Sequence, residues 1–316
     1  MVLSEPGSYV WWWGDLRKLD PTKTADAMAA LGIKGIIVQV AREAPPWCRK
    51  ASNTQPFIDR EIRVYPGLGF DFGGTPTGPA AVTALRDCLS AVDFCKGRWE
   101  SKHGTTRGLG SGGMVNWEIA WDGQRTLAQY VVEETLKVRP DAPQLLTDAP
   151  WWAPLYLPKK PGEKTKWTHP SAPTLEFGRL ASADRYPQTY GANVEGSPDG
   201  ASLNMLKWSR DQSQYPAIAA RAGVAQWLIR PSLQMYKRSL QDQIDTTLRE
   251  PIQCLWDWRE MDENCRMGLA VVKALKDRKF EGPDAVRNFQ TISGLKVDGI
   301  AGFKETIPAL GIPCPH

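Results

Sequence analysis

The sequence contains 316 residues with a formal net charge of +4, of which 23% are charged and 42% hydrophobic. These values are typical of a globular protein and exclude a disordered, collagen-like or coiled-coil chain, while the length allows one large domain with or without a small one. The small net charge does not indicate nucleic acid as a partner. No apolar run is long enough to span a membrane, so we expect no membrane-spanning segment.

Eight apolar segments are typical of strands, and several are continuous runs, as expected of strands buried on both faces. They are residues 9–13, 35–40, 62–65, 114–120, 144–147, 185–190, 225–229 and 252–256. Helical patterns lie between them at residues 22–31 (after Asp20 and before Gly32), 79–95 (before Gly97), 124–138 and 239–249. Alternating strands and helices predict an α/β fold, a (β/α)₈ TIM barrel over residues 1–262, with a doubly wound open sheet as the alternative.

The tail, residues 263–316, has a different pattern. A helical run at 266–276 comes first, and Val286 and Phe289 then share one face of a second helix that ends in Gln290. We expect Gly294, Gly299 and Gly302 in turns with positive φ, and Asp298 as the cap of the helix that carries Thr306. This order of elements resembles the small three-helix peptidoglycan-binding domain of cell-wall hydrolases. The resemblance implies a three-helix fold and peptidoglycan as partner, although the same residues also serve as core and turns.

The fourth predicted strand carries the strongest candidate for chemistry, in the run Asn116-Trp117-Glu118. Strand residues alternate sides, so Asn116 and Glu118 would both point into the barrel near its C-terminal mouth, where barrel active sites lie. A glutamate among tryptophans loses hydration, which favours its protonated form and suits a general acid. The alternative for Glu118 is a buried ion pair with an arginine.

This strand resembles that of lysozyme-like and chitinase-like barrel glycosidases, which carry Asp-x-Glu there with the glutamate as acid. The resemblance implies that Glu118 is the acid, while Asn116 replaces the aspartate that positions the substrate's N-acetyl group. Glycoside hydrolysis normally uses two carboxyl groups. For the second we favour Asp148, at the end of the neighbouring strand, and next Asp15. Asp71, Glu43 and Asp257 stay open.

Further polar and aromatic residues near predicted strand ends are candidates for sugar binding. Gln188 and Tyr190 share one face of strand six, and Tyr236 follows strand seven. The resemblance implies that Trp256, at the end of strand eight, is the floor of a sugar subsite, because indole faces stack on sugar rings. Trp151, and the run of tryptophans at 11–13, would add platforms at the same rim.

The sequence predicts no metal and no cofactor. Its six cysteines form no CxxC pair and it has three histidines, so a zinc site is not expected. The glycines at 108, 110 and 113 fit a dinucleotide-binding pattern, but they precede a strand instead of following one.

The resemblances together imply a peptidoglycan glycosidase of the bacteriophage endolysin or virion-associated lysin type. No signal peptide is visible at the N-terminus, so such an enzyme would act from the host cytoplasm after release to the cell wall, or from the virion. Two alternatives remain open. One is a non-catalytic phage tail or wall-binding protein with a degenerate barrel, and the other is a glycosidase for a different polysaccharide. Oligomeric state is not predicted.

Overall fold

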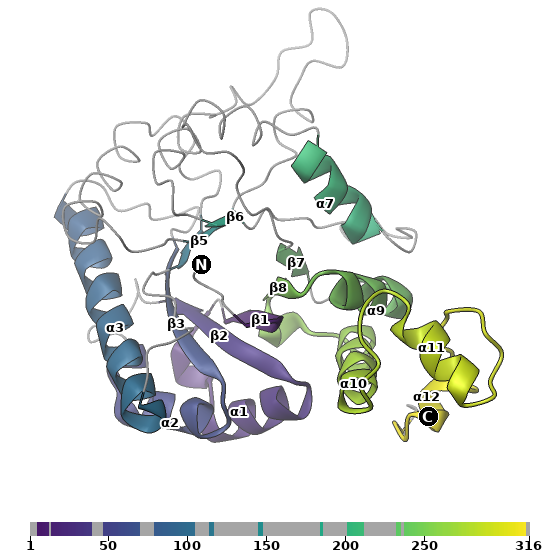
Figure 1. Ribbon diagram of the computed structural model, residues 1–316. Helices are drawn as coiled ribbons and strands as arrows, with labels where there is room; N and C mark the ends of the chain where they lie inside the picture. Colours follow the sequence, from purple (N-terminus) through teal and green to yellow (C-terminus); the bar gives the residue numbers. More distant parts are fainter. Residues whose placement is uncertain are drawn as a thin grey trace, which may run out of the picture.

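The strands form one parallel sheet in the order of a TIM barrel (Figure 1). The computed structural model describes residues 5–12, 14–39, 47–69, 79–104, 114–116, 145–147, 184–185, 201–211, 232–234 and 237–313. The strands are β1 (Gly7–Trp12), β2 (Ile33–Gln39), β3 (Arg63–Gly69), β4 (Met114–Asn116), β5 (Leu145–Thr147), β6 (Asp184–Arg185), β7 (Ser232–Gln234) and β8 (Ile252–Trp256). Strand β1 pairs in parallel with both β2 and β8. The first and last strands are therefore neighbours, which fits a closed barrel and rules out the doubly wound alternative.

Helices follow the strands along the chain and cover the outside of the sheet, as α1, α2 and α3 do beside β1–β3 in Figure 1. They are α1 (Pro21–Ala30), α2 (Ala51–Asp59), α3 (Pro79–His103), α7 (Ala201–Asp211), α9 (Leu240–Arg249), α10 (Glu263–Asp277), α11 (Ala285–Ile292) and α12 (Thr306–Ala309). Short 3₁₀ helices are η1 (Leu16–Lys18), η2 (Trp47–Arg49) and η5 (Trp258–Glu260). Among the residues described, no helix is long and apolar enough to cross a membrane.

Alternation along the strands divides the core into an inner and an outer layer. Tyr9, Trp11, Ile37, Tyr65, Cys254 and Trp256 pack together inside the barrel. Their neighbours, such as Val10, Trp12 and Leu255, pack outward against the helices. Two glycines make the inner layer possible: a Cβ on Gly35 would lie 2.6 Å from the Tyr9 ring, and one on Gly67 would lie 3.2 Å from the Trp11 ring.

Helix α1 has the predicted ends. The Asp20 side chain accepts the Lys23 N–H at 3.0 Å, and Gly32 follows with φ of 70°. Helix α3 differs from the prediction, since it continues through the exposed Gly97 to His103. The physical reason is packing further along the helix: Trp99 is buried, with the Arg63 guanidinium 4.7 Å from its ring centroid and His103 stacked on it.

The seventh strand is also displaced from its predicted position. Strand β7 begins at Ser232, directly after Pro231, while the predicted range 225–229 lies outside the described residues. Helix 124–138, and the later parts of predicted strands four and six, lie outside them as well.

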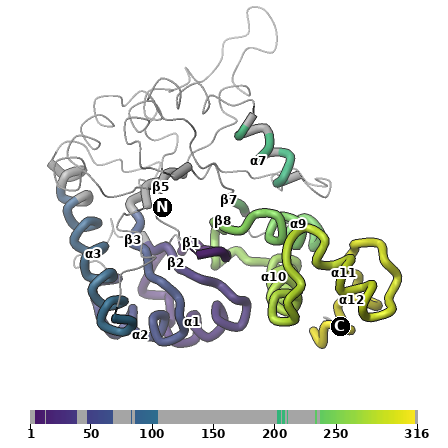
Figure 2. The backbone as a smooth tube through the Cα atoms, viewed as in Figure 1, coloured from purple at the N-terminus to yellow at the C-terminus, as the bar shows by residue number. Residues whose placement is uncertain are grey.

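The last two helices, α11 and α12, pack against α9 and α10, on the side of the molecule away from α3 (Figure 2). Its core joins side chains of α11 and α12 to Ile244 and Leu248 of α9 and to Val271 and Leu275 of α10. Helix α10 also gives Cys265 and Leu269 to the outer layer of the barrel. The division of the chain at 262/263 stays a prediction, but α10 contributes to the cores on both sides of it.

The tail motif is held together from within. Val286 and Phe289 are both buried, as predicted. The buried Gln290 Nε2 donates to Asp298 Oδ1, to the Ile300 carbonyl and to Thr306 Oγ1 at 3.0–3.1 Å, and its Oε1 accepts the Gly299 N–H.

Two expectations for the tail were wrong. Gly294 and Gly299 have positive φ, but Gly302 does not. Asp298 does not cap α12, which starts eight residues later. Its carboxylate accepts the Ile300 N–H at 2.9 Å instead, because the hydrogen bond from Gln290 Nε2 holds that carboxylate within the turn.

Candidate active site at the carboxyl ends of β1 and β8

The carboxyl ends of parallel strands meet at one end of the barrel, and two tryptophans lie there side by side. The rings of Trp11, from β1, and Trp256, from β8, have centroids 5.5 Å apart and planes tilted by 48°. Trp11 is fully buried and Trp256 is partly exposed. Trp11 therefore supports Trp256 from inside the barrel, and Trp256 is the indole with surface to offer to a ligand.

Asp257 follows Trp256 through a cis peptide bond and is bound on both oxygens by one arginine. Its Oδ2 accepts Arg259 Nη2 at 2.7 Å and Nε at 3.1 Å, while Oδ1 accepts the Arg259 backbone N–H at 3.0 Å. The Asp257 side chain is 1% exposed and that of Arg259 is 42% exposed. A buried carboxylate with this many charge-assisted hydrogen bonds is fixed in place.

Asp15 repeats this arrangement at the end of β1. Its Oδ1 accepts both the backbone N–H and the Nε of Arg17, and its Oδ2 accepts Nη2 at 3.1 Å. These hydrogen bonds from Arg17 lower the pKa of Asp15 below its ordinary value. Asp15-Leu16-Arg17 and Asp257-Trp258-Arg259 are thus the same Asp-x-Arg motif, each with its aspartate at the start of a 3₁₀ helix.

Arg259 links the two strand ends. Its guanidinium lies so close to the Gly14 backbone that a Cβ on Gly14 would be 2.6 Å from Nη1, so a residue with a side chain would displace it. Glu260, next in the chain, has its pKa raised by partial burial and then by the charge of Asp257. The sequence analysis missed Arg17, Arg259 and Glu260. The Asp-x-Arg motif, which occurs twice in the sequence, could have identified the two arginines, and Glu260 directly follows the second one.

This arrangement can orient a ligand and supply fixed charge, but neither aspartate is suited to donate a proton. Both oxygens of each carboxylate already accept hydrogen bonds from an arginine, and those bonds lower the pKa of Asp15. Proton donation at this mouth therefore requires another group.

The predicted site residues fall into two sets. Asp15, Trp256 and Asn116 are described; Asn116 is the last residue of β4 and pairs with Gly69 of β3 and Thr147 of β5. The rest lie outside the described residues: Glu118, Asp148, Gln188, Tyr190, Tyr236, Trp151, Asp71 and Glu43. Their placement and roles stay predictions. Within the described ranges, no cluster of acidic, histidine or cysteine side chains could hold a metal ion.

One expected platform was wrong. Trp12 is buried in the outer layer with Val10 and Leu16, because alternation turns it toward the helices, and it presents no face at the rim.

The opposite end of the barrel interior is closed by polar side chains. The buried Arg63 forms an ion pair with Glu5 at 2.6 Å, and Tyr9 Oη donates to the Glu5 carbonyl. Burial raises the pKa of Tyr65 to about 12. Because side chains fill the interior at this level, a ligand would reach Trp256 from the carboxyl ends of the strands.

No protein-family model and no curated protein matches the sequence. Solved structures resemble it at low identity. A dihydrodipicolinate synthase from Rhodopseudomonas palustris is 12% identical, with 88% of this chain and 77% of that one covered and a TM-score of 0.44. A family 39 glycoside hydrolase from Bacteroides cellulosilyticus WH2 is 11% identical, with 86% of this chain and 64% of that one covered and a TM-score of 0.49. The catalytic domain of a chitinase from Pyrococcus furiosus is 10% identical, with 85% of this chain and 95% of that one covered and a TM-score of 0.48. These resemblances do not identify a reaction.

Proposed function

We propose that this chain is a glycoside hydrolase that cleaves glycosidic bonds in the glycan strands of peptidoglycan. The observation that carries the proposal is the Trp11–Trp256 pair at the mouth of the barrel. A partly exposed indole resting on a buried one is a rigid apolar floor, and the C–H faces of sugar rings stack on such a floor without needing charge.

We assign the general acid to Glu118. Strand register is compatible with this assignment: Met114 pairs with Gly67 and Asn116 with Gly69 of β3, and Asn116 is the last residue of β4, two residues before Glu118. Asp15 and Asp257 each accept hydrogen bonds from an arginine on both oxygens, which leaves the proton donor to a different carboxyl group. Asp148 is our first choice for the second carboxylate and Asp15 the next. Asn116, Gln188, Tyr190, Tyr236 and Trp151 would bind the sugar beside Trp256.

We further propose that the tail attaches the enzyme to the cell wall, as in an endolysin or virion-associated lysin. The polar side chains of the tail motif, Asp298 and Thr306, are hydrogen-bonded to Gln290, so a glycan would bind to a different surface of the tail. Ile292, Val297, Ile300 and Phe303 are large apolar side chains that the tail exposes by 45–76%, and they are the candidates for that surface.

The first test is loss of turbidity of purified cell walls. Wild type should clear the suspension, and Glu118→Gln should lower the rate by about 10²–10⁴-fold, the usual size of a general-acid effect. Glu260→Gln is the matched control, since it also removes one carboxylate beside the mouth, and it should keep most of the rate. Equal clearing by wild type and Glu118→Gln would remove Glu118 from the mechanism.

Product masses identify the substrate. Digestion of defined muropeptides should release disaccharide-containing fragments. Release from chitin oligomers alone would mean a glycosidase for a different polysaccharide.

A non-catalytic wall-binding or phage tail protein is the second candidate. Two observations favour it: Asp15 and Asp257 at the mouth are each bound by an arginine, and Asn116 stands where the resembling glycosidases have an aspartate. Sedimentation of the wild-type protein with cell walls, with no released product after long incubation, would support this candidate over the hydrolase.

A further inference from the structure

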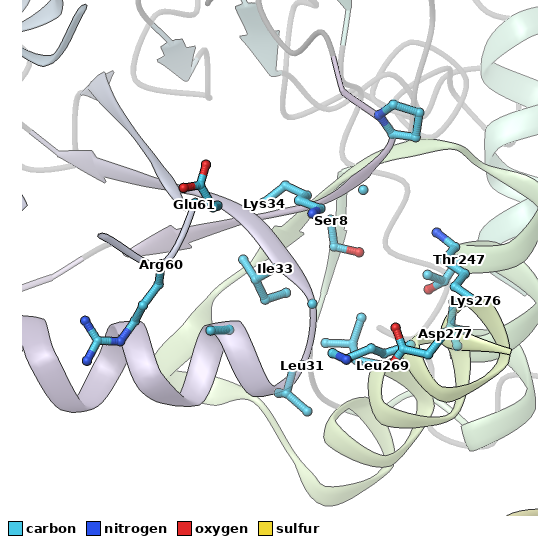
Figure 3. Close-up of a pocket in the computed structure, with 16 residues that line it drawn as sticks. Ser8, Leu31, Ile33, Lys34, Arg60, Glu61, Thr247, Leu269, Lys276 and Asp277 are labelled. Carbon is cyan, nitrogen blue, oxygen red and sulfur yellow. Dashed lines mark hydrogen bonds and ion pairs between the residues drawn. The ribbon is translucent and has the colours of Figure 1, made fainter. Parts of the chain in front are cut away.

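A cavity of about 350 Å³ lies at the other end of the barrel, at the amino ends of β1 and β2 (Figure 3). Its walls come from the first residues of these strands, from the C-terminal ends of α1 and α2, and from α9 and α10. It is separated from the candidate active site by the filled interior around Tyr9, Tyr65 and Arg63. A ligand here would therefore not be the substrate of the mouth.

Most charges around the cavity are already paired. Arg60 binds Asp26 at 2.6 Å, Glu61 binds Lys102 at 2.7 Å, and Lys273 binds Asp277 at 2.6 Å. Two cations remain. Lys34 of β2 and Lys276 of α10 enter the cavity from different walls, and within the described part of the chain neither has an ion pair or a hydrogen bond from its ammonium group.

Both lysines line the same cavity, and their stems are packed on its walls. The Lys34 stem lies across the Gly7 backbone, in the space that a Cβ on Gly7 would occupy. Lys276 is partly buried on α10. Burial lowers the pKa of Lys276, the charge of Glu281 raises it, and the charge of Lys34 lowers it by a smaller contribution. Two like charges at one cavity favour a bound anion, and Glu281 supplies part of that counter-charge to Lys276.

The helix ends at the cavity do not supply that counter-charge, because other groups already bind their carbonyls. Arg60 Nη1 donates to the Pro56 carbonyl at the end of α2, and Arg278 Nη1 donates to the Ala274 carbonyl of α10. The Ala29 carbonyl of α1 accepts the Gly32 N–H. Lys34 and Lys276 are therefore not helix caps.

Ser8 adds a neutral donor. Its buried Oγ accepts Gln253 Nε2 at 2.9 Å, which leaves the hydroxyl proton to be donated, and the residue lines the cavity. Two ammonium groups and a hydroxyl match the charge and the acceptor oxygens of a phosphate group. We propose that this cavity is a second ligand site, which binds a small phosphate-bearing anion between Lys34 and Lys276.

The test is thermal unfolding of the full chain in inorganic phosphate, with potassium chloride at equal ionic strength as reference and glycerol phosphate as an organic monoester. Phosphate should raise the Tm of wild type by several degrees over chloride, and calorimetric titration should give one site per chain. Lys34→Met and Lys276→Met should each weaken binding at least about tenfold, since each removes one charge-assisted contact. Lys23→Met, an exposed lysine elsewhere, should behave as wild type.

The size of the phosphate effect gives a sharper criterion. Relative to chloride, phosphate should raise the Tm of wild type more than that of Lys276→Met, because only wild type offers both ammonium groups to the anion. Lys276→Arg keeps the charge and should retain binding. The proposal is overturned if phosphate stabilises wild type and Lys276→Met equally, or if wild type gains nothing over chloride. If both anions stabilise wild type, a larger rise in Tm with glycerol phosphate than with inorganic phosphate would identify the preferred ligand as an organic monoester.

Discussion

Two aspartate–arginine pairs at the barrel mouth have the same sequence spacing but different surroundings. The Asp257 side chain is 1% exposed, whereas that of Asp15 is 31% exposed and its partner Arg17 is 83% exposed. Removing the arginine from a buried pair leaves an uncompensated charge, while an exposed pair contributes little. The two pairs should therefore differ in stability although they look alike in sequence.

Substitution of the arginines tests this difference. Arg259→Met should lower the free energy of unfolding by about 2–3 kcal/mol, less than for a fully buried pair because Arg259 itself is part-exposed. Arg17→Met should cost less than about 1 kcal/mol. Urea denaturation of both variants gives the comparison. Equal losses would show that Asp257 reaches water once its partner is gone.

Helix ends show a second contrast, at the scale of secondary structure. Helices α10, α11 and α12 all end in a Schellman motif: the N–H groups of Phe280, Leu295 and Ile312 bind the carbonyls of Leu275, Gln290 and Ile307. The left-handed residue in this motif is Gly294 for α11 and Gly311 for α12, but Lys279, with φ of 66°, for α10. A side chain in that conformation is strained, which glycine avoids.

Lys279→Gly should therefore stabilise the protein, by about 0.5–1 kcal/mol, because the relief of strain outweighs the extra freedom of the unfolded chain. The reverse exchange, Gly294→Lys, should destabilise it by a similar amount. Both changes are read from the midpoint of urea unfolding. A loss of stability in Lys279→Gly would mean that the lysine side chain makes a contribution larger than the strain.

The sequence predicted those elements whose apolar pattern is long or whose ends carry a cap. Strands β1, β2 and β8, and helix α1 with Asp20 and Gly32, lie within a few residues of their predicted bounds. Strand β7 is only Ser232–Gln234, with one buried leucine, and too short for a periodic signal. Gly97 predicted a helix end, but tertiary packing of Trp99 overrides that local preference.

The candidate site was less accessible to prediction than the fold. Trp256 and Asp15 were identified from their positions after strands, and both lie at the mouth. Their partners were not found, because the pairing of Asp257 with Arg259 and the approach of Arg259 to Gly14 depend on three-dimensional neighbours. Trp12 was assigned to the rim because a run of tryptophans does not show which of its members faces inward.

At the scale of the whole molecule, helix α10 belongs to two cores. Cys265 and Leu269 are buried in the outer layer of the barrel, and Val271 and Leu275 are buried in the core of the tail. The helix that follows β8 is therefore needed by the barrel as well as by the tail. A cut before α10 and a cut after it should have different effects.

A chain that ends after Asp262 should fail to fold, since the barrel loses the side chains that cover β8 and its neighbours. A chain that ends after Glu281 should fold with a Tm several degrees lower, because Ile244 and Leu248 of α9 become exposed. Size-exclusion chromatography and thermal unfolding by circular dichroism distinguish the two. A folded 1–262 fragment with the Tm of the full chain would show that α10 is dispensable.

The contact between α9 and the tail has a consequence for any polymer that the protein handles. Gln241 binds the Gly299 carbonyl and the Ala301 N–H through its side-chain amide, and Ile244 lies in the tail core. These contacts put the exposed apolar side chains of the tail and Trp256 at a set separation in this structure. A glycan strand bound at both points would have to be long enough to bridge that separation, and a shorter oligomer would bind at one point alone.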